Sequence, residues 1–218
     1  MTLPAAVNLP EVYRYLGYGK DAQPDGETCR RLDAVCTRLL GTARPHGVWR
    51  ALTLAETEPL WQGGDIARHL AGCDGCVLLA VTLGVQTDAL LRALSAADVA
   101  DAVLADAAAS VLTEQLAQQA EDAARAEAAR QGRYLTGRFS PGYGDFPIAV
   151  QPQLLRLLDA PRAIGLCASA SCLLTPRKSV TAVCGTAAHP VTGRLAGCAH
   201  CALRTTCAYR KQGRTCSE

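Results

Sequence analysis

A short segment, residues 138–147, combines ionisable and aromatic side chains with residues that shape the backbone. Arg138 carries a planar guanidinium that suits a carboxylate, Tyr143 an aromatic ring with a polar tip, and Asp145 a carboxylate. Glycine lets the backbone approach a ligand closely, and proline reduces the entropy lost on binding. Such a segment suits a zwitterionic ligand that carries a planar base, and a purely structural loop is the alternative. The backbone-shaping residues are Pro141, Gly142 and Gly144.

A second group of reactive side chains lies near the C-terminus, in the pattern Cys198-x2-Cys201-x5-Cys207 followed by Cys216. A Cys-x2-Cys pair places two thiolates on one side of a turn, as zinc and iron–sulfur sites require. We expect these four residues to bind zinc or a [4Fe–4S] cluster, of which the cluster could supply a reducing electron. A redox-inert tail is the alternative.

The composition excludes several classes of protein. Hydrophobic residues make up 49% and charged residues 19% of the 218 residues, a balance that can bury a core and argues against disorder. A net charge of +2 gives no global reason to bind nucleic acid or a membrane. No apolar run approaches the roughly 18–20 residues of a membrane span, and no secretory signal is recognisable. We therefore expect a cytoplasmic protein whose eleven cysteines stay reduced.

The spacing of apolar residues predicts separated helices and strands rather than a regular βαβ repeat. This favours an α+β fold, with one large domain whose mixed or antiparallel twisted sheet is flanked by helices. The predicted helices are 27–40, 65–70, 95–130 and 153–158, and the predicted strands are 48–54, 77–81, 163–166 and 180–183.

The longest of these elements is the alanine-rich segment 95–130, which contains neither glycine nor proline. We expect its second half, with the pair Glu121 and Arg125 on its surface, to be more exposed than its first half. The first half offers a stripe of larger apolar residues to the core, namely Val99, Val103, Leu104, Val111, Leu112 and Leu116.

The segment Arg138-x-x-Pro141-Gly142-Tyr143 is similar to a known signature. It resembles the Arg-x-x-x-Gly-Tyr motif of the activation (reactivation) domain of cobalamin-dependent methionine synthase. In that family, the loop that carries this motif binds S-adenosylmethionine.

A second motif of the same family resembles residues 164–180. The family has Ile-Gly, then Leu-Thr-Glu-Ser, then Pro and Ser-Val, whereas Ala170 stands here in place of the glutamate. Segments 11–18 and 82–84 resemble a stand-alone form of the domain, so the resemblance extends from about residue 10 to residue 186. The matching positions of the second motif are Ser171, Pro176, Ser179 and Val180.

The resemblance implies a role for several side chains. Members of the family reactivate cob(II)alamin by adding one electron while S-adenosylmethionine supplies a methyl group. Arg138 would then meet the methionine or ribose oxygens, Tyr143 would line the pocket, and the backbone near Asp145 would meet the adenine. The matching Ser171 would be a further contact, and Glu114 would face the ammonium or sulfonium charge.

The resemblance also implies a division of labour. Residues 1–186 would form the activation-like domain, and residues 187–218 a cysteine-rich basic segment that binds metal. We recognise no homocysteine, folate or cobalamin site, so the cobalamin would belong to a separate methionine synthase that lacks its own activation domain. A flavodoxin-type or other protein would donate the electron. The chain would thus be an accessory component, and whether it is itself an enzyme stays open. The alternative is a metal- or iron–sulfur-binding redox or interaction protein that functions through its C-terminal cysteines.

Overall fold

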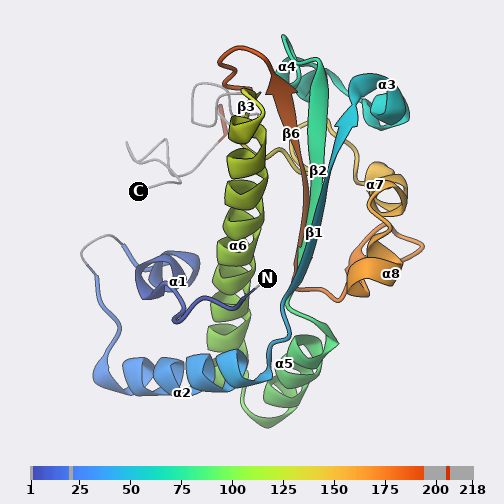
Figure 1. The fold of residues 1–218 in the computed structure, drawn as a ribbon. Coiled ribbons are helices and arrows are strands. Elements are labelled where there is room, and N and C mark those ends of the chain that lie inside the picture. The colour runs from blue at the N-terminus through green and yellow to red at the C-terminus, as the bar shows by residue number, and fades with distance from the viewer. Residues whose placement is uncertain (1, 20–21, 194–204, 207–218) are drawn as a thin grey trace.

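The computed structural model describes residues 2–19, 22–193 and 205–206 (Figure 1). Cys198, Cys201, Cys207 and Cys216 lie outside these residues. The metal site and the division of the chain after residue 186 therefore stay predictions.

The main sheet has four antiparallel strands in the order β1-β2-β6-β3. Strand β2 lies between β1 and β6, and all of its residues are buried. Its continuous apolar run is what a strand covered on both faces requires, so the strand predicted at 77–81 is confirmed. A short hairpin of β4 and β5 forms a second sheet. The strands are β1 (His46–Thr53), β2 (Gly75–Thr82), β3 (Tyr134–Leu135), β4 (Cys167–Ala168), β5 (Leu174–Thr175) and β6 (Ser179–Ala187).

Helix α6 (Val99–Arg130) covers one face of this sheet along much of its length (Figure 1). Its second half packs closely, because alanine side chains let a helix approach a sheet. The second half nevertheless has fewer buried residues than the first half of α6, as expected. The placement of Glu121 on the surface is wrong, since this residue is only 8% exposed. The alanines buried here are Ala117, Ala120, Ala124 and Ala128.

The segment predicted as one helix from residue 95 is interrupted at Asp98. Helix α5 (Val85–Ala97) ends there, and the Asp98 carboxylate caps α6 by accepting the N–H groups of Ala100 (2.8 Å) and Asp101 (3.1 Å). Two members of the predicted buried stripe are exposed, since Val99 is 76% and Val103 55% accessible to solvent. Leu104, Val111, Leu112 and Leu116 are buried as predicted.

The opposite face of the sheet is covered by helices α7 (Gln151–Leu157) and α8 (Ala160–Ile164) (Figure 1). The strand predicted at 163–166 is wrong. Pro161 suits the first turn of a helix, and Gly165, at a φ of +66°, ends it in the left-handed region.

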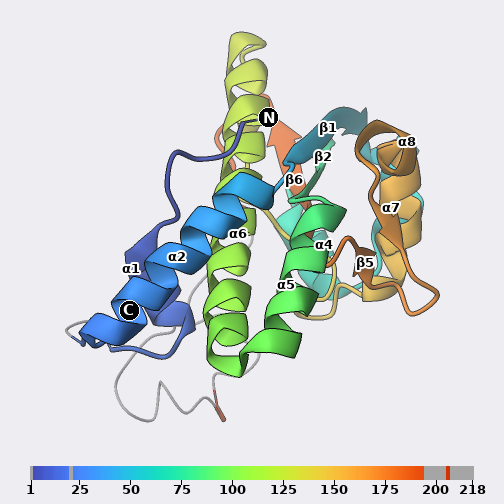
Figure 2. The same ribbon diagram turned by 90° about the horizontal axis from the view of Figure 1, so that it is seen from below.

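The remaining helices complete the α+β fold that the sequence predicts. Helices α1 and α2 pack on α6, as Figure 2 shows from below. None of the described helices is long and apolar enough to span a membrane. These elements are α1 (Leu9–Tyr15), α2 (Gly26–Thr42), α3 (Leu54–Thr57), α4 (Gly64–His69) and the 3-10 turns η1 (Glu58–Leu60) and η2 (Ile148–Val150).

Candidate functional site

The predicted ligand loop, residues 138–147, leaves the sheet beside β6 and closes on itself. Phe139 exchanges two backbone hydrogen bonds of 2.9 Å with Val183, and the N–H of Gly142 donates to the carbonyl of Phe146 (2.8 Å). The rings of Phe139 and Phe146 stack with their centroids 6.0 Å apart, and Pro141 is buried. These buried apolar side chains and the backbone hydrogen bonds hold the loop in one shape, whereas Gly142 and Gly144 are exposed.

At its far end, the loop is fastened to the start of α4 by Asp145. The two carboxylate oxygens of Asp145 accept the N–H groups of Gly64 and Asp65, each at 2.8 Å. In return, the N–H of Asp145 donates to the Asp65 carboxylate at 3.2 Å. The N–H groups of Asp65 and Gly64, together with the Arg68 guanidinium, hold the pKa of the Asp145 carboxyl below its usual range. Both oxygens of this predicted ligand contact are therefore engaged within the protein.

Gly63 makes this clamp possible. Its φ of +109° lies in a region that L side chains rarely adopt, and a Cβ atom there would lie 2.5 Å from the Asp145 carbonyl oxygen. Sequence analysis missed Gly63, although the run Gly63-Gly64-Asp65 is a visible turn signal.

At its near end, the loop presents Arg138 to two carboxylates of α6. Nε of Arg138 donates to Glu121 at 2.9 Å, and Nη1 donates to Glu114 at 3.2 Å. The Glu121 side chain is 10% exposed and the Glu114 side chain 45%. The structure thus brings together Arg138 and Glu114, which are separate in the sequence and were both predicted as ligand contacts.

Two tyrosines lie near this ion pair. Burial raises the pKa of Tyr15, and the nearby Glu114 carboxylate and Tyr143 hydroxyl raise it further. Tyr143 is 65% exposed and Tyr15 is 45% exposed. We call Tyr15, Glu114, Arg138 and Tyr143 the Arg138 cluster. Tyr15 lies within the segment 11–18, but the sequence pattern does not predict it as a ligand contact.

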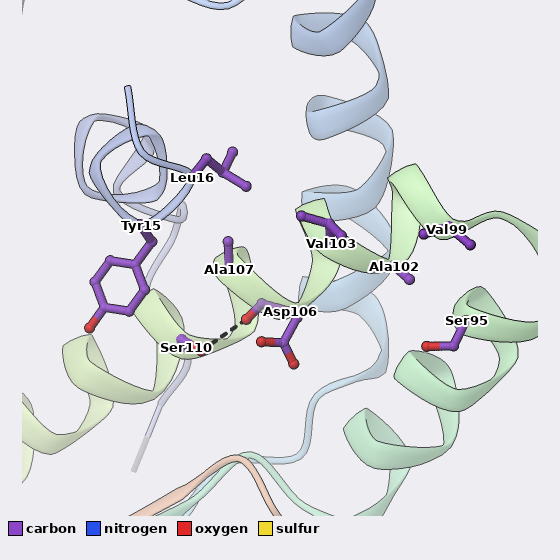
Figure 3. A pocket seen from close by; sticks show the side chains of 9 residues that line it. All are labelled: Tyr15, Leu16, Ser95, Val99, Ala102, Val103, Asp106, Ala107 and Ser110. Carbon is purple, nitrogen blue, oxygen red and sulfur yellow. Dashed lines mark hydrogen bonds between the residues drawn. The ribbon is translucent and has the colours of Figure 1, made fainter. Parts of the chain in front are cut away.

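A cavity of about 540 Å³ extends from Tyr15 along the first half of α6 to Ser95 of α5 (Figure 3). Tyr15 lies at one end, and the exposed Val99 and Val103 lie toward the other. Its polar side chains include Asp106, whose carboxylate pairs with Lys178 at 2.9 Å. Most of its lining residues are apolar, among them Leu16, Val99 and Val103, and Tyr15 belongs both to the cavity and to the Arg138 cluster.

Ser171 lies in the turn between β4 and β5, and its hydroxyl is 2.9 Å from that of Ser169. Within the described residues, no hydrogen bond joins Ser171 to the loop 138–147. Its role as a ligand contact stays a prediction.

The described cysteines are free thiols, and no three described His, Cys, Asp or Glu residues are grouped to hold a metal ion. Burial raises the pKa of Cys76 to about 11 and that of Cys184 to about 12. Cys184 is fully buried beneath α6. It therefore presents no surface to a ligand.

Comparisons with known proteins give one clear result. No protein-family model matches the chain, and no curated protein does. Among solved structures, the crystal structure of the MetH reactivation domain bound to AdoHcy matches with a TM-score of 0.65 and 20% sequence identity. The match covers 97% of this chain and 82% of that one. The chain has the fold of the MetH reactivation domain. At this identity the likeness concerns the fold alone.

Proposed function

We propose that this chain binds S-adenosylmethionine at the Arg138 cluster and supports the reductive methylation of a corrinoid held by a separate cobalamin-dependent methionine synthase. The observation that carries the proposal is the pairing of Arg138 with Glu114 in a cluster that includes two exposed tyrosines. The fold supports it, because the similar reactivation domain was crystallised with AdoHcy.

The side chains of the cluster match the chemistry of such a ligand. S-adenosylmethionine carries a carboxylate, an ammonium, a sulfonium and a flat adenine. The Arg138 guanidinium can bind the carboxylate, and the Glu114 carboxylate can bind the ammonium or the sulfonium. These two side chains pair with each other at 3.2 Å. A zwitterionic ligand can therefore replace the Arg138–Glu114 ion pair by two new pairs, one with Arg138 and one with Glu114. Neither side chain then loses its charged partner.

The loop would contribute the rest of the site. Tyr143 offers an aromatic face against which the adenine can lie. The exposed backbone at Gly142 and Gly144 can approach the ring nitrogens of the adenine. The clamp at Asp145 keeps this backbone in place before the ligand arrives, which lowers the entropy cost of binding. The adenine would thus contact the backbone next to Asp145 rather than its carboxylate.

The chemistry requires little more of this chain than positioning. S-adenosylmethionine supplies the methyl group when bound, and a flavodoxin-type or other donor supplies the electron. The loop and α6 would hold the sulfonium in a fixed direction and exclude water from it. The partner would be a methionine synthase that lacks its own reactivation domain.

Calorimetric titration with S-adenosylmethionine tests the proposal. We expect binding to the wild type and a loss of affinity of at least about tenfold in Arg138→Ala, since a charge-assisted hydrogen bond is lost. Arg156→Ala is the matched control, because Arg156 is an exposed arginine on α7, across the sheet. Absence of binding to the wild type, or equal affinity of the wild type and Arg138→Ala, would contradict the proposal.

Two further measurements address the rest of the proposal. Adding the chain to a methionine synthase without a reactivation domain should restore its activity from the cob(II)alamin state when an electron donor and S-adenosylmethionine are present. The metal-binding alternative depends on cysteines outside the described residues, and the visible spectrum of anaerobically purified protein tests it. Absence of both iron and zinc would remove that alternative.

A further inference from the structure

Glu121 is a carboxylate in a place where the fold needs only small apolar residues. It lies on α6 between the buried alanines Ala117, Ala120 and Ala124, and its side chain is 10% exposed. Burying a charge costs free energy unless the charge is paired and hydrogen-bonded. Packing of α6 on the sheet therefore does not explain this carboxylate.

Both oxygens of Glu121 are used by arginines. Oε1 accepts from Arg125 at 2.6 Å, and Oε2 accepts from Nε of Arg138 at 2.9 Å. Arg125 also donates to the carbonyls of Leu135 (2.8 Å) and Thr136 (3.0 Å). These carbonyls lie two and three residues before Arg138, so Glu121 and Arg125 fix the start of the loop to α6.

As a consequence, the guanidinium of Arg138 is anchored to a buried carboxylate through Nε alone. Its Nε is occupied by the buried Glu121, whereas Nη1 donates to the more exposed Glu114. Nη2 makes no hydrogen bond with any residue that the structure describes. The two terminal nitrogens are thus the part of Arg138 that a ligand can engage without breaking the buried contact.

We propose that Glu121 is the positioning residue for Arg138, which it holds at Nε so that the two terminal nitrogens receive the ligand carboxylate. This inference rests on the proposed function and deepens it by naming the residue that orients Arg138 toward the ligand carboxylate. Glu114 and Glu121 then differ in role: Glu114 exchanges its partner when the ligand binds, and Glu121 keeps Arg138 throughout.

The experiment compares two ligands on Glu121→Gln. S-adenosylhomocysteine carries the amino-acid carboxylate, and 5′-methylthioadenosine is a thionucleoside without it. The glutamine is nearly isosteric, but one of its two acceptor oxygens becomes an NH₂ donor, so it cannot accept from both arginines. We expect the affinity for S-adenosylhomocysteine to fall at least about tenfold while that for 5′-methylthioadenosine changes less than about twofold. A merely structural role would weaken both ligands equally and would overturn the inference.

Controls keep the outcome interpretable. Glu127→Gln is the matched control, because Glu127 is also on α6 but pairs with Arg130 away from the cluster. It should bind both ligands as the wild type does. Should Glu121→Gln fail to fold, Glu121→Asp retains the charge on a shorter side chain and should show the same ligand selectivity to a smaller degree. Failure of the wild type to bind either nucleoside would refute the proposed function itself, whereas equal losses for both ligands would refute only the role of Glu121.

Discussion

The two ends of the loop 138–147 are held by different interactions. At Asp145, both carboxylate oxygens accept backbone N–H groups of α4, and a return hydrogen bond comes from the loop. At Arg138, one of the two contacts is an ion pair with Glu114, whose side chain is 45% exposed. Exposed ion pairs contribute little to stability, about 0–1 kcal/mol. The Asp145 contacts are therefore part of the fold, whereas the Glu114 contact at the other end can exchange partners.

This difference predicts that substitutions at the two ends separate stability from binding. Changes at the α4 clamp should destabilise the protein, whereas changes at the Glu114 pair should leave stability nearly intact and affect the ligand. Three substitutions test this, in decreasing order of their expected effect on stability.

Gly63→Ala should be the most damaging. Its Cβ would lie 2.5 Å from the Asp145 carbonyl oxygen, at a φ of +109°. Strain and overpacking of this kind cost roughly 2–5 kcal/mol of unfolding free energy. Chemical denaturation measures the loss. Gly137→Ala is the control, because a Cβ there meets nothing within 4 Å, and a comparable loss in that variant would refute the steric explanation.

Asp145→Asn should destabilise the protein less, and in a pH-dependent way. The folded state lowers the pKa of Asp145, so its carboxylate contributes stability above the unfolded-state pKa of about 3.9. That contribution is lost as the pH falls through the lower, folded-state pKa. The difference in unfolding free energy between the wild type and Asp145→Asn should therefore be largest near neutral pH and shrink below about pH 4. A difference that stays constant between pH 7 and pH 3 would contradict the clamp.

Glu114→Gln should have the smallest effect on stability, within about 0.5 kcal/mol, because it removes an exposed ion pair. The same variant should bind S-adenosylmethionine several-fold more weakly, since the cationic part of the ligand loses its partner. Thermal denaturation and calorimetry on one preparation measure both effects. A strongly destabilised Glu114→Gln variant that binds S-adenosylmethionine normally would contradict the proposed difference between the two ends of the loop.

Much of the fold follows from local sequence patterns. The apolar run of β2 predicts a fully buried strand, and the glycines and prolines of residues 138–147 predict an irregular loop. The errors have local causes too. Asp98 caps a new helix, which apolar periodicity does not register, and Gly165 ends a short helix that resembles a strand in length.

The candidate site is less accessible from sequence, because its decisive contacts join distant segments. Arg138 and Tyr143 stand out by type and spacing, but Asp145 reaches back 81 residues to Gly64. The burial of Glu121 depends on how α6 lies on the sheet and on the arrival of Arg138 from the loop. No pattern within one helix shows that a carboxylate among alanines will be buried and doubly paired.

A crystal structure of this chain with S-adenosylhomocysteine tests the central claim most directly. The account predicts that the ligand carboxylate contacts the terminal nitrogens of Arg138, the ammonium contacts Glu114, and the adenine lies against Tyr143. A ligand bound instead beside Val99 and Val103 in the cavity along α6, or an Arg138–Glu114 pair unchanged in crystals that contain the ligand, would contradict it.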